Sequence, residues 1–273
     1  MNRRQFLSLF AAAPLVSASL AAAAPRFGAR RKKGVGVVAK PDGKWLETVN
    51  KLKVEWFYTW GSGRPSAVPV TVDFIPMIWG YWGDKAGIAR LGEAAKSAGV
   101  RELLGFNEPD EHTQSNISVG KALDAWPDLM KTGLRLGSPG CVHPDNAWMK
   151  AFMKGVDERR LRVDFICMHA YPGTDAKAFL NHLENIHRAY QRPLWITEFA
   201  CGDWQAKSAQ ENRHKPAAVL KFMEQVLPRL EQSPFVERYA WFSSSPGSAA
   251  LGTSALLDRT GALTELGNFY QSV

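Results

Sequence analysis

Short apolar runs alternate along the chain with longer stretches in which apolar residues recur at helical spacing. Several of the short runs contain almost no polar residue, which is typical of strands that are buried on both faces. The predicted strands are Val35–Val38, Val54–Trp60, Val72–Trp79, Glu102–Asn107, Leu134–Ser138, Val163–Tyr171, Leu194–Phe199 and Arg238–Phe242.

Helical patterns lie between many of these strands. The predicted helices are Ala86–Ala98, Val119–Met130, Ala147–Gly155, Ala176–Tyr190 and Lys215–Gln232. Strands that alternate with helices favour a parallel sheet with helical crossovers, and eight such strands are the number in a TIM barrel. We therefore predict an α/β fold in which a single domain forms a (β/α)8 TIM barrel.

The first residues have the pattern of an export signal. Arg3-Arg4-Gln5-Phe6-Leu7 is a twin-arginine pattern, and the apolar, alanine-rich run Leu9–Ala24 follows it. A charged start, a short apolar stretch and small residues together describe a signal peptide. We predict a twin-arginine-type signal peptide over residues 1–24, cleaved near Ala21–Ala24.

The domain boundaries and the location of the protein follow from this signal. Residues 25–33 form a predicted basic linker, and residues 34–273 form the barrel domain. We expect a bacterial protein that is periplasmic or secreted and has no stable membrane association after cleavage. The alternative is that the apolar run stays uncleaved and acts as a membrane anchor. No other segment is apolar for long enough to span a bilayer.

The composition narrows the possible partners. The chain has 273 residues and a formal net charge of +8, but its basic residues are dispersed apart from Arg26–Lys33, so we expect no nucleic-acid partner. The chain has 10 Trp, which suggests a cleft lined by rings. Cys141, Cys167 and Cys201 have neither metal-site nor disulfide-framework spacing, so buried thiols are expected, with one disulfide as the alternative. We expect a monomer.

Candidate chemistry comes from the residues that close the predicted strands, because the active site of a TIM barrel lies at the carboxyl ends of its strands. Two carboxylates, an amide, a histidine, a tyrosine and several indoles converge there, an inventory that suits sugar chemistry. The candidates are Asn107, Glu108, His169, Tyr171, Glu198, Trp60, Trp79 and Trp241.

Strand alternation bears on which of these side chains point into the barrel. Ile196 shares a face with Glu198, and Phe106 shares a face with Glu108. If these faces look into the barrel, both glutamates point at its mouth. Asn107 has the opposite parity and reaches the site only if the strand bends at its end.

Two glutamates at strand ends fit glycoside hydrolysis, which needs one protonated and one ionised carboxyl group. Glu108 would be the general acid and base, and Glu198 the nucleophile. A separation of about 5 Å between the carboxyl groups would predict retention of configuration, whereas about 7–9 Å would predict inversion. The structural alternatives are that a strand-end glutamate caps the next helix and that His169 is a hydrogen-bonded core histidine. His143 with Asp145 lacks a third ligand, so we predict no metal site.

Several motifs in one order resemble glycoside hydrolase family 128, whose members are also described as Asl1-like glycosyl hydrolase catalytic domains. They are Glu55–Gly61, Phe74–Gly80, Leu104–Asp110, Ser138–Gly140, Val163–Phe165, Trp195–Ala200, Tyr239–Phe242 and Thr264–Tyr270, the last resembling a closing helix. The resemblance implies a TIM-barrel, retaining β-1,3-glucanase that needs no cofactor or obligatory metal. It implies that Glu108 is the acid/base, that Glu198 is the nucleophile and that Asn107 binds the sugar 2-hydroxyl.

One position departs from the family pattern and leaves part of the function open. An aromatic residue is expected between the histidine and the tyrosine, but Ala170 lies between His169 and Tyr171. The length of β-glucan bound, and the choice between endo and exo action, therefore stay open. The alternatives to a β-1,3-glucanase are a retaining glycosidase for another β-glucan or mannan and a non-catalytic carbohydrate-binding barrel.

Overall fold

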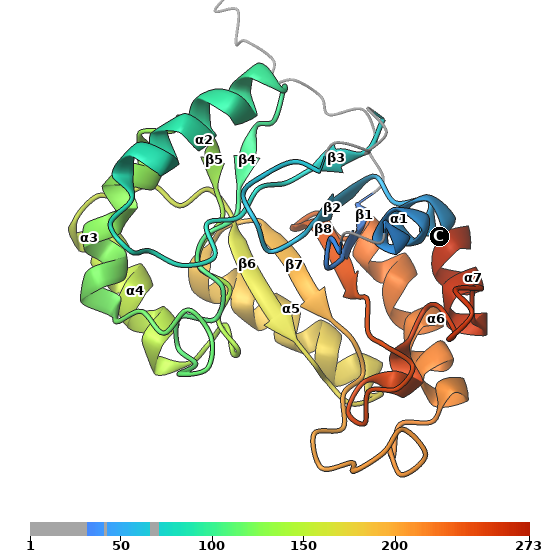
Figure 1. Ribbon diagram of the computed structural model, residues 1–273. Coiled ribbons are helices and arrows are strands. Elements are labelled where there is room, and N and C mark those ends of the chain that lie inside the picture. The colour runs from blue at the N-terminus through green and yellow to red at the C-terminus, as the bar shows by residue number, and fades with distance from the viewer. Residues whose placement is uncertain (1–31, 41–42, 66–70) are drawn as a thin grey trace, which may run out of the picture. The chain divides into compact units, whose positions relative to one another are not determined.

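Strands and helices alternate through almost the whole described chain (Figure 1). The computed structural model describes residues 32–40, 43–65 and 71–273. The strands are β1 Lys33–Gly36, β2 Trp56–Tyr58, β3 Asp73–Phe74, β4 Glu102–Leu103, β5 Arg135–Leu136, β6 Ile166–Ala170, β7 Leu194–Phe199 and β8 Val236–Phe242. The helices are α1 Lys44–Leu52, α2 Lys85–Ser97, α3 Val119–Met130, α4 Ala147–Glu158, α5 Ala176–Tyr190, α6 Pro216–Gln232, the 3-10 helix η1 Gly252–Ser254 and α7 Glu265–Ser272.

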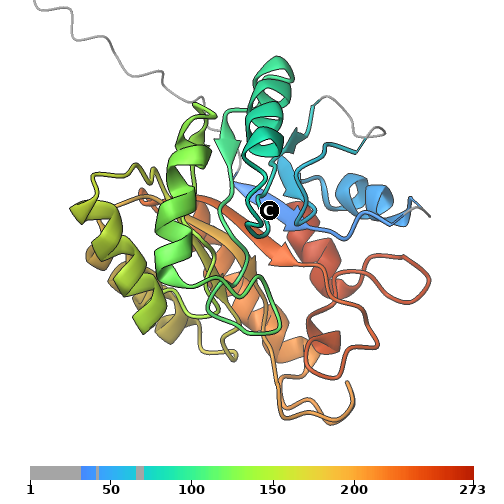
Figure 2. The ribbon, with the colours of Figure 1, turned by 60° about the vertical axis from the view of Figure 1, so that its left-hand side comes forward.

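The strands form a parallel ring. Hydrogen-bonded strands follow the order β3-β2-β1-β8-β7-β6, and β4 pairs with β5. Single parallel bridges join Met77 to Leu104 and Gly137 to Phe165, and these connect β4 and β5 to the rest of the ring. The helices lie around the outside of the strands in two views (Figures 1 and 2). The predicted single-domain (β/α)8 barrel is confirmed.

The elements differ from the prediction mainly at their ends. The predicted strand Val72–Trp79 is reduced to β3. Ile75 N still donates to Phe57 O, but Pro76 has no N–H for the ladder, and the next bridge, from Met77 to Leu104, is on the other side of the chain. Helix α1 was not predicted, and its mixed charged sequence carries only two buried residues, Val49 and Leu52. The predicted signal peptide, residues 1–24, lies outside the described residues.

The start of the barrel also differs from the prediction by one residue. Lys33 was assigned to the basic linker, but it is the first residue of β1 and is fully buried. Its Nζ donates to the carbonyl oxygens of Tyr270, at 2.8 Å, and Gln271, at 3.1 Å. These carbonyls lie near the end of α7, where a cation is favoured. Lys33 therefore fastens the first strand to the last helix.

Most of the predicted helix starts have a side-chain cap. At each of these positions an oxygen accepts a hydrogen bond from a backbone N–H in the first turn, which would otherwise have no partner. The capping residues are Asp84, Ser118, Asn146, Asp175 and Thr264. These five helices therefore begin at residues that the sequence defines.

Aromatic side chains fill the inside of the barrel. The ring of Trp195 stacks on Phe165 at 4.2 Å between centroids and lies 5.4 Å from the ring of Trp56. The guanidinium of Arg238 lies below them, 4.7 Å from the Trp195 ring centroid, and its Nη2 bonds Asp73 at 3.0 Å. Packing of rings and a cation on rings stabilises this column beyond the area that it buries.

The three cysteines lie in the core. Cys141, Cys167 and Cys201 are buried and have free thiols. Burial raises the pKa of the Cys201 thiol to about 12 and raises the pKa values of the other two further. Among the described residues, no helix has the length and apolarity needed to cross a membrane.

Gly34 offers a test of the packing inside the barrel. A Cβ atom at Gly34 would lie 2.2 Å from the indole of Trp56, which is fully buried and has no space into which to move. Gly34→Ala should therefore lower the free energy of unfolding by about 1–3 kcal/mol, as overpacking of a core does. Denaturant unfolding followed by tryptophan fluorescence will measure it. The control is Gly120→Ala in α3, where a Cβ meets nothing within 4 Å; equal stability of the two variants would contradict this account.

Candidate active site

Three titratable side chains meet at the mouth of the barrel, each from the end of a different strand. Glu108 follows β4, His169 lies in β6, and Glu198 lies in β7. One ligand-capable atom of each lies within 4.8 Å of those of the other two. Nδ1 of His169 bonds Oε1 of Glu108 at 2.9 Å, and its Nε2 lies 3.5 Å from Oε1 of Glu198.

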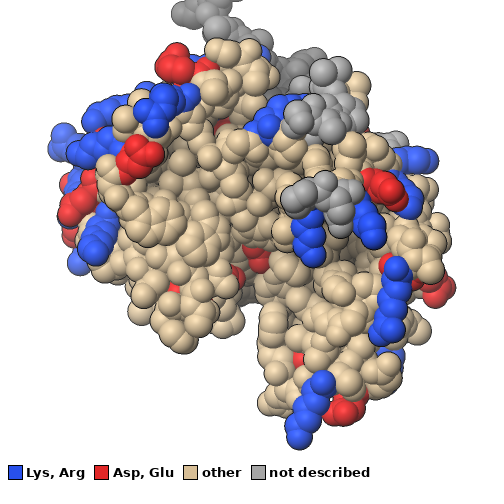
Figure 3. All heavy atoms as spheres, viewed as in Figure 1, with Lys and Arg blue, Asp and Glu red and all other residues tan. Residues whose placement is uncertain are grey.

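The surface above the mouth is hollowed. In the space-filling view, acidic atoms are visible at the floor of the hollow, whereas most Lys and Arg side chains lie farther out, at the left edge and on the right-hand side of this face (Figure 3). The side chain of Glu108 is 15% exposed, whereas that of Glu198 is only 7% exposed. A molecule entering the hollow therefore meets Glu108 before it reaches the deeper Glu198.

The carboxylate of Glu198 is oriented by three donors. Trp60 Nε1 donates to Oε1 at 2.7 Å. Tyr58 OH lies 3.2 Å from the same oxygen and shares its one proton between Oε1 and the carbonyl oxygen of Thr197, which is 3.0 Å away. Tyr171 OH donates to Oε2 at 2.5 Å. Burial, followed by the negative charge of Glu198, raises the pKa values of both tyrosines well above their usual range, so both hydroxyls keep their protons. Each oxygen of Glu198 is thus aimed by at least one fixed donor.

Burial and the neighbouring charges act in opposite directions on the pKa of His169. Burial disfavours its charged form, but the negative charges of Glu198, Glu108 and Asp110 and the hydrogen bond to Glu108 prevail and raise the pKa of His169 above its ordinary value. A proton on this imidazole is therefore favoured between the two carboxylates, where it weakens their mutual repulsion.

Simple strand alternation does not explain why the side chains of Glu108 and Glu198 face the mouth. Ile196 and Phe106 do not face the barrel interior; both belong to the cluster between the strands and the helices, and Phe106 packs on Trp126 of α3. That premise of the prediction was wrong. Irregular backbone at the strand ends, rather than simple alternation, turns Glu198 and Glu108 inward.

In β7 the irregularity is an extra residue. Met168 of β6 pairs with Ile196, but the next residue, His169, pairs with Glu198, so Thr197 has no residue opposite it. A bulge of this kind reverses the facing of every later side chain. After β4 the irregularity is at Glu108 itself, whose φ is +41°, in the left-handed region that non-glycine residues rarely adopt.

Asn107 lies under the site and is 4% exposed. Its Nδ2 donates to Gln114 Oε1 at 3.2 Å, and its Oδ1 has no partner within the described part of the chain. A buried amide oxygen with no partner is costly unless another molecule donates to it.

Trp60 and Trp79 lie beside the carboxylates, on the β2 and β3 sides of the mouth. Trp60 has a left-handed φ of +58°, and its indole is committed to Glu198. Trp79 stacks on Trp82, with ring centroids 6.0 Å apart and planes 13° apart. These three indoles border a pocket of about 320 Å³ that Met77 and Tyr81 also line.

Trp241 does not belong to the site, and its assignment as a sugar-binding ring was wrong. It is fully buried, its Nε1 donates to Ser254 O at 2.9 Å, and its ring packs on Phe199 on the outer face of the sheet. Because side chains alternate along β8, the next residue takes the place at the mouth. Phe242 contacts the rings of Trp60 and Tyr171, both with centroids 5.7 Å away.

Several side chains at the site were missed by sequence reasoning. Tyr58 lies in a predicted strand two residues before Trp60, so alternation places both side chains on the same face, and this could have identified Tyr58. Trp82 and Trp204 are in loops, 77% and 66% exposed, where sequence pattern carries no facing information. Trp204 packs edge-on against Tyr171, 5.4 Å between centroids, so both exposed indoles lie next to residues of the mouth.

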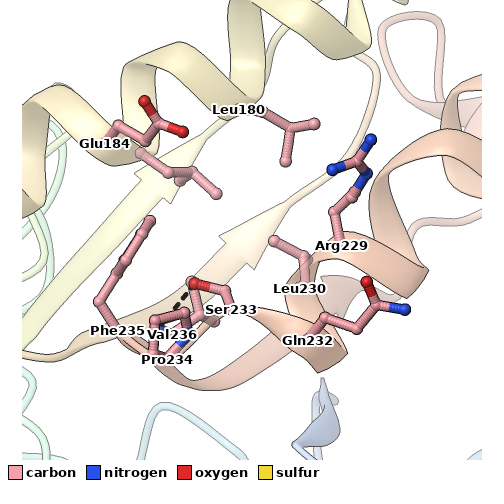
Figure 4. Close-up of a pocket in the computed structure, with 10 residues that line it drawn as sticks. Leu180, Glu184, Arg229, Leu230, Gln232, Ser233, Pro234, Phe235 and Val236 are labelled. Atoms are coloured by element: carbon pink, nitrogen blue, oxygen red, sulfur yellow. Dashed lines mark hydrogen bonds between the residues drawn. The ribbon is translucent and has the colours of Figure 1, made fainter.

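A further hollow lies away from this site. It has a volume of about 340 Å³ between α5 and α6, and Leu180, Arg229 and Phe235 are among its lining residues (Figure 4). It reaches Val236, the first residue of β8. It is therefore at the opposite end of the strands from the two glutamates.

A paired carboxylate site at the carboxyl end of a (β/α)8 barrel, bordered by indoles, defines the class of glycoside hydrolases. Comparison with known proteins gives the same class. The family model described as glycosyl hydrolase catalytic core matches residues 34–270. The chain belongs to this family and, by the similarities that follow, to its GH128 members.

This chain aligns with nearly the full length of two solved GH128 structures. The chain is 33% identical to a subgroup I endo-β-1,3-glucanase from Amycolatopsis mediterranei in complex with laminaritriose, with a TM-score of 0.74 over 89% of this chain and 99% of that one. It is 26% identical to a subgroup III curdlan-specific exo-β-1,3-glucanase from Blastomyces gilchristii in complex with glucose, with a TM-score of 0.69 over 89% and 98%.

A third relative is longer than this chain. Alkali-sensitive linkage protein 1 of Schizosaccharomyces pombe is 27% identical over 252 residues, which are 88% of this chain and 44% of that protein. The chain thus spans less than half the length of this relative.

Tyr171 offers a test of how Glu198 is oriented. Tyr171→Phe removes the donor to Oε2 but keeps the ring, so kcat should fall by about 10–100-fold, or about 1.4–2.7 kcal/mol, with little change in folding. Steady-state kinetics on laminarin will measure it. The matched control is Tyr239→Phe, whose hydroxyl donates to Glu231 at 2.7 Å far from the mouth. An equal loss of kcat in both variants would rule out a specific role for Tyr171.

Proposed function

We propose that this protein is a retaining, endo-acting β-1,3-glucanase. The observation that carries the proposal is the approach of a Glu108 oxygen to within 4.8 Å of a Glu198 oxygen at the barrel mouth. Carboxyl groups about 5–5.5 Å apart are typical of retention, whereas inversion needs about 6.5–9.5 Å to admit a water molecule. The GH128 relatives described above are β-1,3-glucanases, which supports β-1,3-glucan as the substrate.

The different surroundings of the two glutamates support distinct roles. Glu198 accepts bonds from three fixed donors and is nearly buried, which suits a nucleophile that must be aimed at one carbon atom. Among the described residues, the carboxylate of Glu108 is hydrogen-bonded to His169 alone, and it is more exposed, which suits a group that exchanges protons with water. We therefore assign Glu198 as nucleophile and Glu108 as general acid and base.

The proposed reaction has two steps. First, Glu108 gives its proton to the glycosidic oxygen while Glu198 attacks the anomeric carbon, which breaks the bond to the leaving sugar and forms a glycosyl ester. Then Glu108 takes a proton from water, and the resulting hydroxide displaces Glu198. Two displacements at one carbon restore the original anomeric configuration.

The neighbouring side chains support these steps. Tyr171, Tyr58 and Trp60 hold Glu198 while its charge falls during attack and returns when the ester is hydrolysed. His169 keeps Glu108 in place through Nδ1. The free Oδ1 of Asn107 is a natural acceptor for a sugar hydroxyl, and the indoles of Trp79, Trp82 and Trp204 offer faces for sugar rings.

Two features support endo action, namely the open hollow above the carboxylates and the indoles on two sides of it. Trp79 and Trp82 lie on the β3 side of the carboxylates and Trp204 on the β7 side, so sugar rings can be held on both sides of the scissile bond. The subgroup I relative, with the higher identity of the two solved structures described above, is named an endo-enzyme.

Substitution of each glutamate will separate the two roles. Glu108→Gln should slow laminarin hydrolysis by about 10²–10⁴-fold and spare aryl β-glucosides with good leaving groups more, because these need little protonation. Glu198→Gln should abolish both activities. Glu158→Gln on α4, with its side chain 64% exposed, is the control. Equal losses on both substrates in the Glu108 variant would refute the assignment.

A substrate panel in the same assays tests the activity itself. Laminarin should be cleaved to a ladder of oligosaccharides, with lichenan and mannan cleaved at least tenfold more slowly, and NMR should detect the β-anomer first. Release of glucose alone would favour exo action, and preferred cleavage of mannan would overturn the proposed substrate. Oligosaccharide binding without products would favour a non-catalytic barrel.

We also propose that the protein is exported to the periplasm or beyond it by the twin-arginine route and acts there as a monomer. Arg3-Arg4 and the alanine-rich run up to Ala24 support this proposal. N-terminal sequencing of the exported protein should begin within a few residues of Ala24, and Arg3→Lys with Arg4→Lys should reduce export. Retention of Met1 on the exported protein would contradict cleavage.

A further inference from the structure

Nε2 of His169 is a buried nitrogen without a hydrogen-bond partner among the described residues. The side chain is 1% exposed, and its other ring nitrogen is already bonded to Glu108. Oε1 of Glu198 lies 3.5 Å from Nε2, a distance at which they attract but do not complete a hydrogen bond. Such a nitrogen, aimed into a site between two carboxylates, points to a ligand that the polypeptide does not supply.

The separation of the two atoms suits a metal ion placed between them. Zinc lies about 2.0–2.2 Å from imidazole nitrogen and carboxylate oxygen, so two ligands at a tetrahedral angle are about 3.4 Å apart. The observed 3.5 Å separation of Nε2 and Oε1 is close to this value. Glu108, with an oxygen within 4.8 Å of an oxygen of Glu198, adds a second negative charge that attracts a cation to this place.

The hydrogen bond on the other side of the ring completes the arrangement. A histidine that binds a metal through one nitrogen usually donates its other N–H to a carboxylate, which fixes the tautomer and orients the ring. Nδ1 of His169 bonds Oε1 of Glu108 at 2.9 Å in that way. A metal ion that binds at Nε2 has to displace the proton that this imidazole otherwise holds, and donation through Nδ1 then leaves the lone pair of Nε2 to the ion.

Room at Nε2 depends on a glycine. A Cβ atom at Gly140 would lie 2.8 Å from Nε2, closer than side-chain atoms normally approach. Gly140 O also accepts the backbone N–H of Glu108 at 2.7 Å, so this residue borders both His169 and Glu108. A methyl group at this position would displace the imidazole from its present place.

We propose that Zn²⁺, or a divalent ion of similar ligand preference, binds between His169 Nε2 and the Glu198 carboxylate and inhibits the enzyme reversibly. The ion occupies the carboxylate that attacks the sugar, so it competes with substrate. Mixed nitrogen and oxygen ligands favour Zn²⁺ or Cu²⁺ over Mg²⁺ and Ca²⁺, which prefer oxygen alone. The inhibition, but not the binding, rests on the function proposed above.

Calorimetric titration of the purified mature protein with ZnCl₂ tests the binding directly. One ion should bind per chain, and His169→Gln should weaken its affinity at least tenfold, while MgCl₂ at a hundredfold higher concentration should give no binding. The control is His112→Gln, a histidine beside Glu111 whose side chain is 85% exposed and which reports zinc bound to the surface. Zinc binding that is unchanged in His169→Gln, or absent from the native protein, would overturn the proposal.

Two further measurements keep the result interpretable. Gly140→Ala retains every ligand, so weaker zinc binding in this variant, with a native circular dichroism spectrum, would support the position of the ion; unchanged binding would count against it. Laminarin hydrolysis should show an increased apparent KM with Zn²⁺ and full recovery with EDTA. Hydrolysis that ignores bound Zn²⁺ would overturn the inhibitory role, whereas absence of hydrolysis with intact zinc binding would overturn the proposed function alone.

Discussion

The site depends on one electrostatic constraint, which is that two carboxylates must lie close together at the mouth of a largely apolar barrel. Like charges at this separation repel, and burial removes the water that would screen them. The protein offsets this with the His169 imidazole between Glu108 and Glu198 and with the donors Tyr58, Trp60 and Tyr171 around Glu198. Without the Glu198 carboxylate, the polar atoms of Tyr58, Trp60 and Tyr171 would lose an acceptor.

The packing below the mouth makes this arrangement rigid. Tyr58 is both a donor to Glu198 and a ring stacked on Trp56, which contacts Trp195 and the cation of Arg238. The position of the carboxylate is thus linked through a continuous column of side chains to the closed lower end of the barrel. A preorganised carboxylate is what catalysis by differential stabilisation of a transition state requires.

Irregular backbone is concentrated where the chemistry is. Glu108 and Trp60 have left-handed backbone conformations, and an extra residue at Thr197 reverses the facing of Glu198. Conformations of this kind cost about 1–3 kcal/mol each and persist only where the surrounding structure enforces them. The hydrogen bonds from Glu108 N to Gly140 O and from Trp60 Nε1 to Glu198 provide that enforcement.

The sequence by itself determined the alternation of strands and helices, the barrel, and the strand ends that carry Glu108, His169 and Glu198, because buried parallel strands are apolar runs that stop abruptly at polar residues. The tertiary structure alone decided which way those residues face. The place of Trp241 near the end of a predicted strand favoured it as a ring at the mouth, but Phe242 takes that place. Strand alternation explained the direction of Glu198 by the facing of Ile196, but Ile196 faces the helices. A one-residue bulge or a left-handed φ has little signature in a single sequence, since it is selected by contacts with distant strands, yet it reverses the direction of a side chain.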